Sequence, residues 1–229
     1  MRSSGYDAIG RLSALGEVTV KRLRFPLAFG LALCSLLAQA QTLPGPREFY
    51  FDDDPQTTRA IVAIPGEGDA VVDRLAAVVA RKPADVESRA QLARIAMRSG
   101  RMDLGEELYR AARKNAGGNQ RLTRQVAWNH GWDLYRAGEP ARALDQWAGL
   151  LGGWPSAPAW QPPTLALGLW KLGRKQEAVA WYAAAVRTEP EQWSSAAGFD
   201  RLLPDWREED RATLAEVQAA WQADPPPWP

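Results

Sequence analysis

A repeated pattern in the middle of the chain constrains the fold most. Glycines stand at positions 66, 100, 138 and 173, at intervals of 34, 38 and 35 residues. Around the last three glycines, residues of one kind recur at fixed distances. A small residue stands seven positions before each glycine and another five positions after it, and a large aromatic residue stands nine after it. The three sets are Ala93, Gly131 and Ala166; Gly105, Ala143 and Ala178; and Tyr109, Trp147 and Tyr182.

This pattern predicts pairs of helices joined by tight turns. Glycine permits the backbone conformation that such a turn requires, and a helix-breaking glycine or proline follows seventeen positions later in each case. In the last copy, Ala178, Trp181, Tyr182, Ala185 and Val186 share one face of a helix. Small residues would let the two helices of a pair approach closely, while the aromatic residue would fill the gap to the next pair. The sequence therefore predicts an all-α fold.

Residues 165–190, with the sequence LALGLWKLGRKQEAVAWYAAAVRTEP, resemble the tetratricopeptide repeat, a helix–turn–helix unit of about 34 residues. The resemblance extends over roughly residues 67–190, and around Gly66 only the second helix matches. It implies an α-α superhelix, here with about eight or nine helices, in which the first helix of each pair lines a concave groove.

The rest of the chain is expected to flank these repeats. Residues 41–56 form an extended N-terminal segment, and the repeats occupy residues 57–190. Residues 191–223 are expected to add two capping helices, because terminal helices usually cover the exposed end of a helical stack. Pro204 should separate the two helices, and residues 224–229 form a proline-rich tail.

Two local features refine these boundaries. Three consecutive aspartates at positions 52–54 are expected at the N-terminus of a helix, where carboxylates suit the free N–H groups and the dipole. The first helix of the last repeat is expected to start near Pro163, because proline fits the first turn of a helix.

The first forty residues are typical of an export signal. A basic run at residues 21–24 precedes an apolar stretch at 25–38, and Ala38, Gln39 and Ala40 form a cleavage site. The apolar stretch is shorter than the roughly twenty residues that span a bilayer. We therefore predict a signal peptide at residues 1–40, with residues 1–19 a gene-model artefact, and a periplasmic or secreted protein. Lipidation of Cys34 and an uncleaved anchor are the weaker alternatives.

Composition and motifs argue against several classes of function. The 28 basic and 27 acidic residues lack the basic excess of nucleic-acid-binding proteins. Cys34 is the only cysteine and His130 the only histidine, so neither a zinc site nor a thiol nucleophile is expected in the exported part. His130 is expected to be structural, pointing between the helices of its own pair. We expect no enzymatic activity, no cofactor and no metal.

Binding is the better-supported class. Applied to this chain, the resemblance places aromatic and basic side chains on the concave face. The candidate binding residues are Arg94, Arg98, Trp128, Trp132, Tyr135, Arg136, Trp170 and Lys171. Aromatic rings beside guanidinium groups suit an extended peptide with a carboxylate or a stacked sugar ring.

The expected function is that of a periplasmic adaptor with a protein or peptide partner. Binding of cell-wall glycan or another carbohydrate is the alternative, because all eleven tryptophans lie between Trp128 and Trp228. An enzyme or an enzyme accessory subunit ranks third. Trp128 and Trp132, four residues apart, either face the groove or pack under the loop at residues 152–162. If they face the groove, replacement of Trp132 should leave the fold intact, whereas Trp147 should be part of the core.

Overall fold

The computed structural model describes residues 42–47, 49–152 and 157–227. The chain divides into two units, Met1–Ala40 and Gln41–Pro229, and the described residues all belong to the second. The predicted signal peptide, its cleavage site and Cys34 therefore lie outside the described residues. No helix in the described part is long and apolar enough to cross a membrane.

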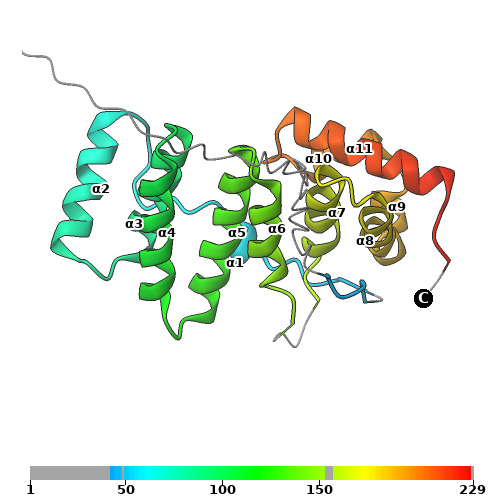
Figure 1. Ribbon diagram of the computed structural model, residues 1–229, viewed down its shortest axis with the longest axis horizontal. Helices are drawn as coiled ribbons and strands as arrows, with labels where there is room; N and C mark the ends of the chain where they lie inside the picture. Colours follow the sequence, from blue (N-terminus) through cyan, green and yellow to red (C-terminus); the bar gives the residue numbers. More distant parts are fainter. Residues whose placement is uncertain (1–41, 48, 153–156, 228–229) are drawn as a thin grey trace, which may run out of the picture. The chain divides into compact units, whose positions relative to one another are not determined.

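The described part is all-helical, which confirms the predicted fold class (Figure 1). The eight longer helices are α2 (Asp69–Arg81), α3 (Val86–Arg98), α4 (Met102–Ala116), α5 (Gln120–Arg136), α6 (Pro140–Ala148), α7 (Gln161–Lys171), α8 (Lys175–Thr188) and α11 (Glu208–Ala223). Three helices have four residues each, namely α1 (Pro55–Thr58), α9 (Pro190–Trp193) and α10 (Phe199–Leu202), and one 3-10 turn covers Ala196–Gly198.

Consecutive helices pack in pairs, α3 with α4, α5 with α6 and α7 with α8 (Figure 1). A glycine follows the first helix of each pair and has a positive φ, of 75° at Gly100, 85° at Gly138 and 72° at Gly173. Residues with a side chain rarely adopt this conformation. The turn glycines of the predicted repeat therefore have the predicted role.

The small residues of the repeat lie where the two helices of a pair approach each other most closely. A methyl carbon added to Gly131 on α5 would lie 2.2 Å from Nε1 of Trp147 on α6. One added to Gly105 on α4 would lie 2.2 Å from Cγ of Met97 on α3. Ala166 and Ala178, at the corresponding positions of the last pair, are both fully buried.

The repeat aromatics connect one helix pair to the next, as predicted. The ring of Tyr109 on α4 stacks on His130 of α5 with 4.3 Å between ring centroids. The ring of Trp147 lies against Gly168 of α7, so close that an added methyl carbon would stand 3.3 Å from it. The hydroxyl of Tyr182 donates a hydrogen bond of 2.6 Å to the carbonyl oxygen of Trp193.

The C-terminal region differs from the expected pair of capping helices. Short turns lead from α8 to Pro204, and a single long helix, α11, follows it. This helix packs on both α7 and α8, and Leu214 and Val217 are fully buried there. The start of α7 also differs slightly, at Gln161 rather than at Pro163, with both prolines in the first turn.

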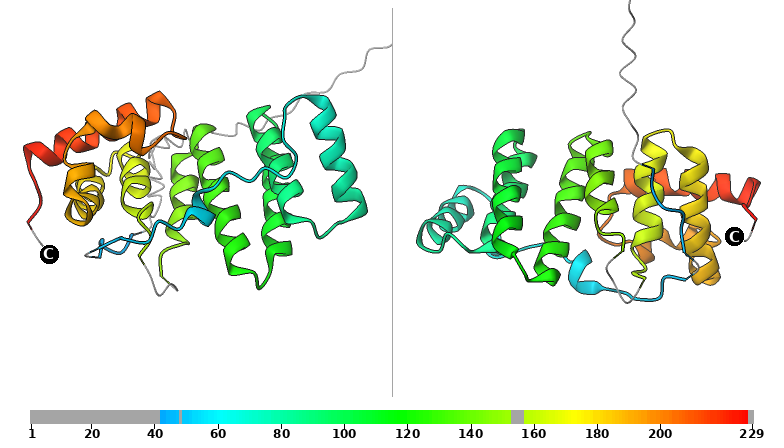
Figure 2. Two further views of the ribbon diagram at one scale, coloured as in Figure 1. Left: turned by 180° about the vertical axis from the view of Figure 1, so that it is seen from behind. Right: turned by 60° about the horizontal axis from the view of Figure 1, so that its bottom comes forward.

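Residues 42–64, which we name the strap, form no helix apart from α1. In Figure 2 this blue-to-cyan segment passes along the helices from α8 towards α3, opposite to the order of the helices in the chain. Hydrogen bonds fix both ends of the path, from Tyr50 N to Thr188 Oγ1 and from Ile64 N to Gln91 Oε1. Leu43, Tyr50 and Ile61 are buried, so the strap is part of the core.

The aspartate run has the expected position but a different role. Asp54 precedes α1, yet its side chain caps no N–H group of that helix. Its carboxylate instead accepts a hydrogen bond of 3.2 Å from Trp160 Nε1 and lies 3.7 Å from Arg124. Asp54 therefore attaches the strap to α5 and to the start of α7.

The contact between Gly131 and Trp147 gives a test of the helix packing. Alanine favours a helix over glycine by about 1 kcal/mol, so Gly131→Ala would stabilise an exposed helix. Here the added methyl group must displace a buried indole, and we expect a net loss of about 1–3 kcal/mol in the free energy of unfolding. Urea unfolding measures it. Gly118→Ala, where nothing lies within 4 Å, is the control, and equal midpoints for both variants would contradict this packing.

Candidate functional site

A cavity of about 470 Å³, which we name the central pocket, lies between the strap, α3, α5, the start of α7 and the region of α9 to α11. Five of the eight candidate residues line it. They are Arg94, Arg98, Trp128, Trp132 and Arg136. The pocket therefore brings together the candidates of the first two helix pairs except Tyr135.

Helix α5 contributes to this lining through two neighbouring stripes. Trp128 and Trp132 form an aromatic stripe, while Asn129, Asp133 and Arg136 form a polar one. Residues three and four apart lie on one face of a helix, which explains why each stripe reaches the same cavity. Of the polar stripe, the sequence pattern predicted only Arg136 as a binding residue, although Asn129 and Asp133 stand at the same helical spacing.

Trp132 is a core residue and does not face an open groove. Its side chain is only 3% exposed. Its ring contacts four other rings, with centroid distances of 4.8 Å to Trp206, 5.3 Å to Trp147, 5.7 Å to Trp128 and 5.8 Å to Tyr135. Trp206, just before α11, packs on the ring. This burial argues against a groove-facing Trp132, so we expect its loss to destabilise the fold.

Three N–H donors at the pocket have no acceptor. Nε1 of Trp128, Nε1 of Trp132 and Nε of Arg136 are buried and form no hydrogen bond within the described residues. A buried donor without a partner costs about 1–3 kcal/mol, and such groups are few in folded proteins. All three are donors, so a molecule that satisfies them must bring acceptors.

The arginines add positive charge that no carboxylate neutralises directly. In the part of the chain that the structure describes, none of Arg94, Arg98 and Arg136 forms an ion pair within 4.0 Å. The guanidinium of Arg136 lies over the ring of Trp132, 5.1 Å from its centroid. Burial, and then the charge of Arg207, lower the pKa of Arg136. An anion in the pocket would offset both effects.

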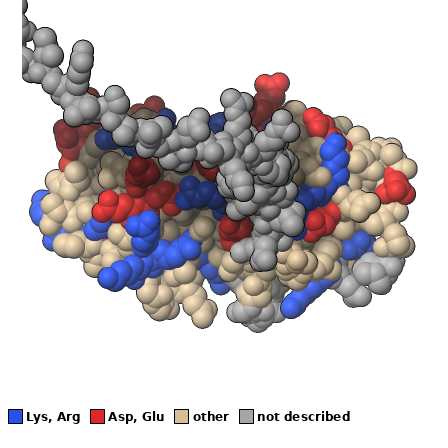
Figure 3. Space-filling view, in the orientation of Figure 1, with Lys and Arg blue, Asp and Glu red and all other residues tan. Residues whose placement is uncertain are grey.

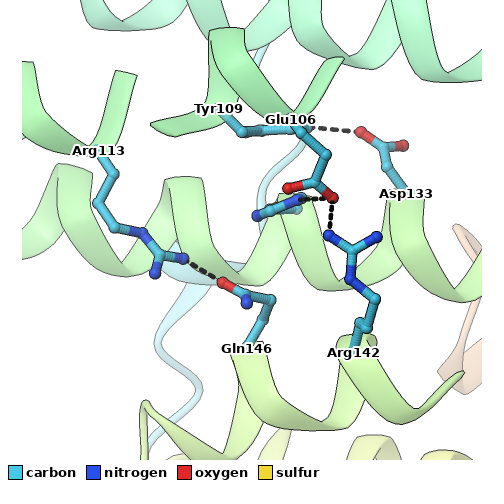
Figure 4. Close-up of polar contacts among 7 residues, drawn as sticks. Glu106, Tyr109, Arg113, Asp133, Arg142 and Gln146 are labelled. Atoms are coloured by element: carbon cyan, nitrogen blue, oxygen red, sulfur yellow. Dashed lines mark hydrogen bonds and ion pairs between the residues drawn. The ribbon is translucent and has the colours of Figure 1, made fainter. Parts of the chain in front are cut away.

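Asp133 is a carboxylate of the pocket lining, and another side chain already engages it. It accepts a hydrogen bond of 2.5 Å from the hydroxyl of Tyr109 (Figure 4). Burial raises the pKa of Asp133, whereas this hydrogen bond and the charges of Arg98 and Arg94 lower it. Burial also raises the pKa of Tyr109 well above its usual value. The pocket is thus connected through Asp133 to the repeat core.

The three other candidates do not reach the central pocket. Tyr135 and Lys171 border a separate, smaller cavity beside Asp210. Trp170 donates from Nε1 to Glu216 of α11 at 2.9 Å, and Lys175 lies over its ring. Helix α11 therefore occupies the part of the groove face that the last helix pair was expected to contribute.

His130 points towards the preceding helix pair, not between the helices of its own pair as expected. Its Nε2 lies 3.3 Å from Oε1 of Glu106 on α4, and Arg142 binds the same carboxylate (Figure 4). Burial lowers the pKa of His130, and Glu106 partly opposes this shift. The tight spacing between Tyr109 and His130 explains the orientation. His130 therefore joins α4 to α5 and lies outside the central pocket.

Charge over the rest of the surface is mixed. Figure 3 shows basic and acidic side chains interspersed over the face drawn, in keeping with the totals of 28 and 27. Among the described residues no group of three or more His, Cys, Asp or Glu side chains could hold a metal ion. Asp53, Asp133, Glu189 and Asp205 line the central pocket as well, so its charges are also mixed. The feature that suggests a ligand is that its three arginines form no ion pair among the described residues.

Comparisons of the chain with protein-family models, with curated proteins and with solved structures found no match. The function must therefore be inferred from the geometry of the pocket and from the sequence.

The ring contacts of Trp132 give a stability prediction. We expect Trp132→Ala to lower the free energy of unfolding by about 3–5 kcal/mol, because four neighbouring rings lose a packing partner. Trp170→Ala, which removes a partly exposed ring on α7, should cost less. Urea unfolding followed by circular dichroism measures both. An unchanged midpoint for Trp132→Ala would show that the aromatic cluster does not support the fold.

The lowered pKa of His130 predicts a pH dependence of stability. In the unfolded chain this histidine takes up a proton near pH 6.5, whereas in the folded protein it does so only at lower pH. Stability present above pH 6.5 should therefore be lost as the pH falls below that value. His130→Phe keeps an aromatic ring against Tyr109 and cannot titrate. The loss of stability between pH 7.5 and 5.5 should be smaller in this variant, and an equal loss would contradict the prediction.

Proposed function

We propose that the protein is an exported, tetratricopeptide-like adaptor, an α-α superhelix that binds a protein or peptide partner in the central pocket. One observation carries the proposal. Among the described residues, two tryptophan N–H donors without acceptors and three arginines without ion-pair partners lie around one cavity. Export is inferred from the signal-like sequence at residues 1–40.

The chemistry of the lining favours a partner that carries a carboxylate. Arginine binds carboxylates through two parallel hydrogen bonds, which are stronger than bonds between neutral groups. The cavity of about 470 Å³ falls in the usual range of small-ligand sites, about 300–1,000 Å³. It therefore suits a short segment of a partner, such as a chain end or one or two side chains. Tryptophan and arginine are also the residues in which binding energy most often concentrates.

A cell-wall glycan is the second candidate. Trp160, Trp193 and Trp206 also line the pocket, and Asn129 and Gln192 supply amide groups beside them. Rings and amides together suit a sugar, but a neutral sugar would offer the three arginines only uncharged acceptors. The pocket thus favours an anionic ligand over a neutral one.

Crosslinking inside the cell would test the proposal. A photoreactive amino acid at Gln192, an exposed pocket residue, would capture the partner in the native envelope, and mass spectrometry would identify the captured segment. Synthetic peptides of that segment are then titrated into the purified protein by calorimetry. We expect Arg94→Gln combined with Arg98→Gln to weaken binding at least about tenfold, because charged hydrogen bonds are lost.

The matched control is Arg101→Gln combined with Arg110→Gln. Arg101 precedes α4 and Arg110 lies on it, and both are exposed and outside the pocket. The two pairs of substitutions change the net charge of the protein by the same amount. Equal weakening by both pairs would show that only overall charge matters and that the pocket is not the site. Sedimentation with purified cell wall, without any captured protein, would favour the glycan.

A further inference from the structure

The strap is held mainly through its backbone at the α3 end. Oε1 of Gln91 accepts hydrogen bonds from the N–H groups of Ala63 and Ile64, at 2.8 and 2.9 Å. Nε2 of Gln91 donates to the carbonyl oxygen of Ile64 at 2.7 Å. One buried amide thus makes the bonds that a neighbouring β-strand would make.

The same arrangement recurs on α5. Oδ1 of Asn129 accepts from the N–H of Ile61 at 3.3 Å, and its Nδ2 donates to the carbonyl oxygen of Arg59 at 3.1 Å. Gln125 donates to that carbonyl as well, at 3.2 Å. Gln91 and Asn129 both stand nine residues before the turn glycine of their pair, so the repeat itself places the two amides in one row.

The strap is also a wall of the central pocket. Asp53, Thr58 and Ala60 of the strap line the cavity. Asn129 and Trp160 line it too, and these are two of the residues that hold the strap. The position of the strap therefore determines the shape of the pocket.

Residues 59–64 are held by hydrogen bonds more than by buried side chains. Arg59, Ala60 and Val62 are exposed, and Ile61 is the only fully buried residue of this stretch. Gly66 and Gly68 follow, with φ values of 107° and 85°, and connect the strap to α2. A segment with few buried groups can open locally without unfolding of the helices.

We propose that residues 59–64 of the strap form a gate that is coupled to the central pocket and held closed by a bound ligand. The inference rests on the proposed function, because it takes the pocket as the binding site. By thermodynamic linkage, whatever loosens the strap must weaken ligand binding, and a bound ligand must hold the strap in place.

Cleavage by trypsin measures how often the gate is open. Trypsin cleaves after Arg59, and the carbonyl carbon that it attacks is the one whose oxygen Asn129 and Gln125 hold. Cleavage therefore requires the strap to leave its seat. Its rate reports the population of the open state when opening is fast relative to cleavage.

Gln91→Leu is the decisive variant, because Gln91 holds the strap yet does not line the pocket. We expect cleavage after Arg59 to accelerate on the order of tenfold, since three hydrogen bonds are lost. The affinity for 1-anilinonaphthalene-8-sulfonate, an aromatic anion used as the pocket probe, should fall as well. The probe should in turn slow cleavage of the wild-type protein.

Two further variants complete the test. Gln125→Ala removes one bond to the Arg59 carbonyl from a partly exposed side chain, and it should act in the same direction should Gln91→Leu fail to fold. Gln146→Ala removes an amide on α6 that binds only Arg113, and it should change neither cleavage nor probe affinity.

The outcomes separate the gate from the site. Unchanged cleavage and probe affinity in both Gln91→Leu and Gln125→Ala would overturn the gate, even when the probe still requires Arg94 and Arg98. Probe binding that is indifferent to Arg94→Gln and Arg98→Gln would instead count against the pocket as the binding site, whatever the strap does. Faster cleavage together with weaker probe binding supports the coupling.

Discussion

The packing of Trp147 into the notch at Gly131 determines where the other elements can lie. The indole is fully buried and donates from Nε1 to the carbonyl oxygen of Trp128, while its other edge lies against Gly168 of α7. One side chain thus sets the separation of α5 from both α6 and α7. Because α5 is fixed in this way, its other stripe, with Asn129 and Asp133, faces the strap and the central pocket. Any larger residue at Gly131 would alter the core and the pocket together.

The helix pairs could be predicted from the sequence because their contacts are local. A small residue, a turn glycine and an aromatic residue at fixed spacing describe packing between neighbouring helices, and burial of Ala143, Ala178 and Tyr182 follows from that spacing alone. The strap could not be predicted in this way. Its residues have no periodic pattern, and its partners, Gln91 and Asn129, lie far along the chain. A buried glutamine nine residues before a turn glycine suggests a role only when the segment that it holds is visible.

The same distinction between local and distant contacts applies to the candidate site. Arg94, Arg98 and Arg136 could be placed on one side of the helices from the repeat register, and the structure brings them to one cavity. Trp132 and Trp170 could not be assigned correctly, because the residues that cover them, Trp206 and Glu216, come from beyond the repeats. Helical spacing indicates which residues share a face. It does not indicate whether a distant segment will pack on that face.

The polar groups of the pocket show a consistent division. Several backbone groups of the strap have side-chain partners, as buried main-chain groups require. Three donors at the cavity, Nε1 of Trp128, Nε1 of Trp132 and Nε of Arg136, have none among the described residues. Asp133 could have accepted hydrogen bonds from these donors. Its carboxylate is instead engaged by Tyr109, and burial raises its pKa. Local violations of polar satisfaction tend to concentrate at functional sites. All three unpartnered groups at the pocket are donors, and this favours an acceptor-rich ligand over solvent as the natural occupant of the pocket.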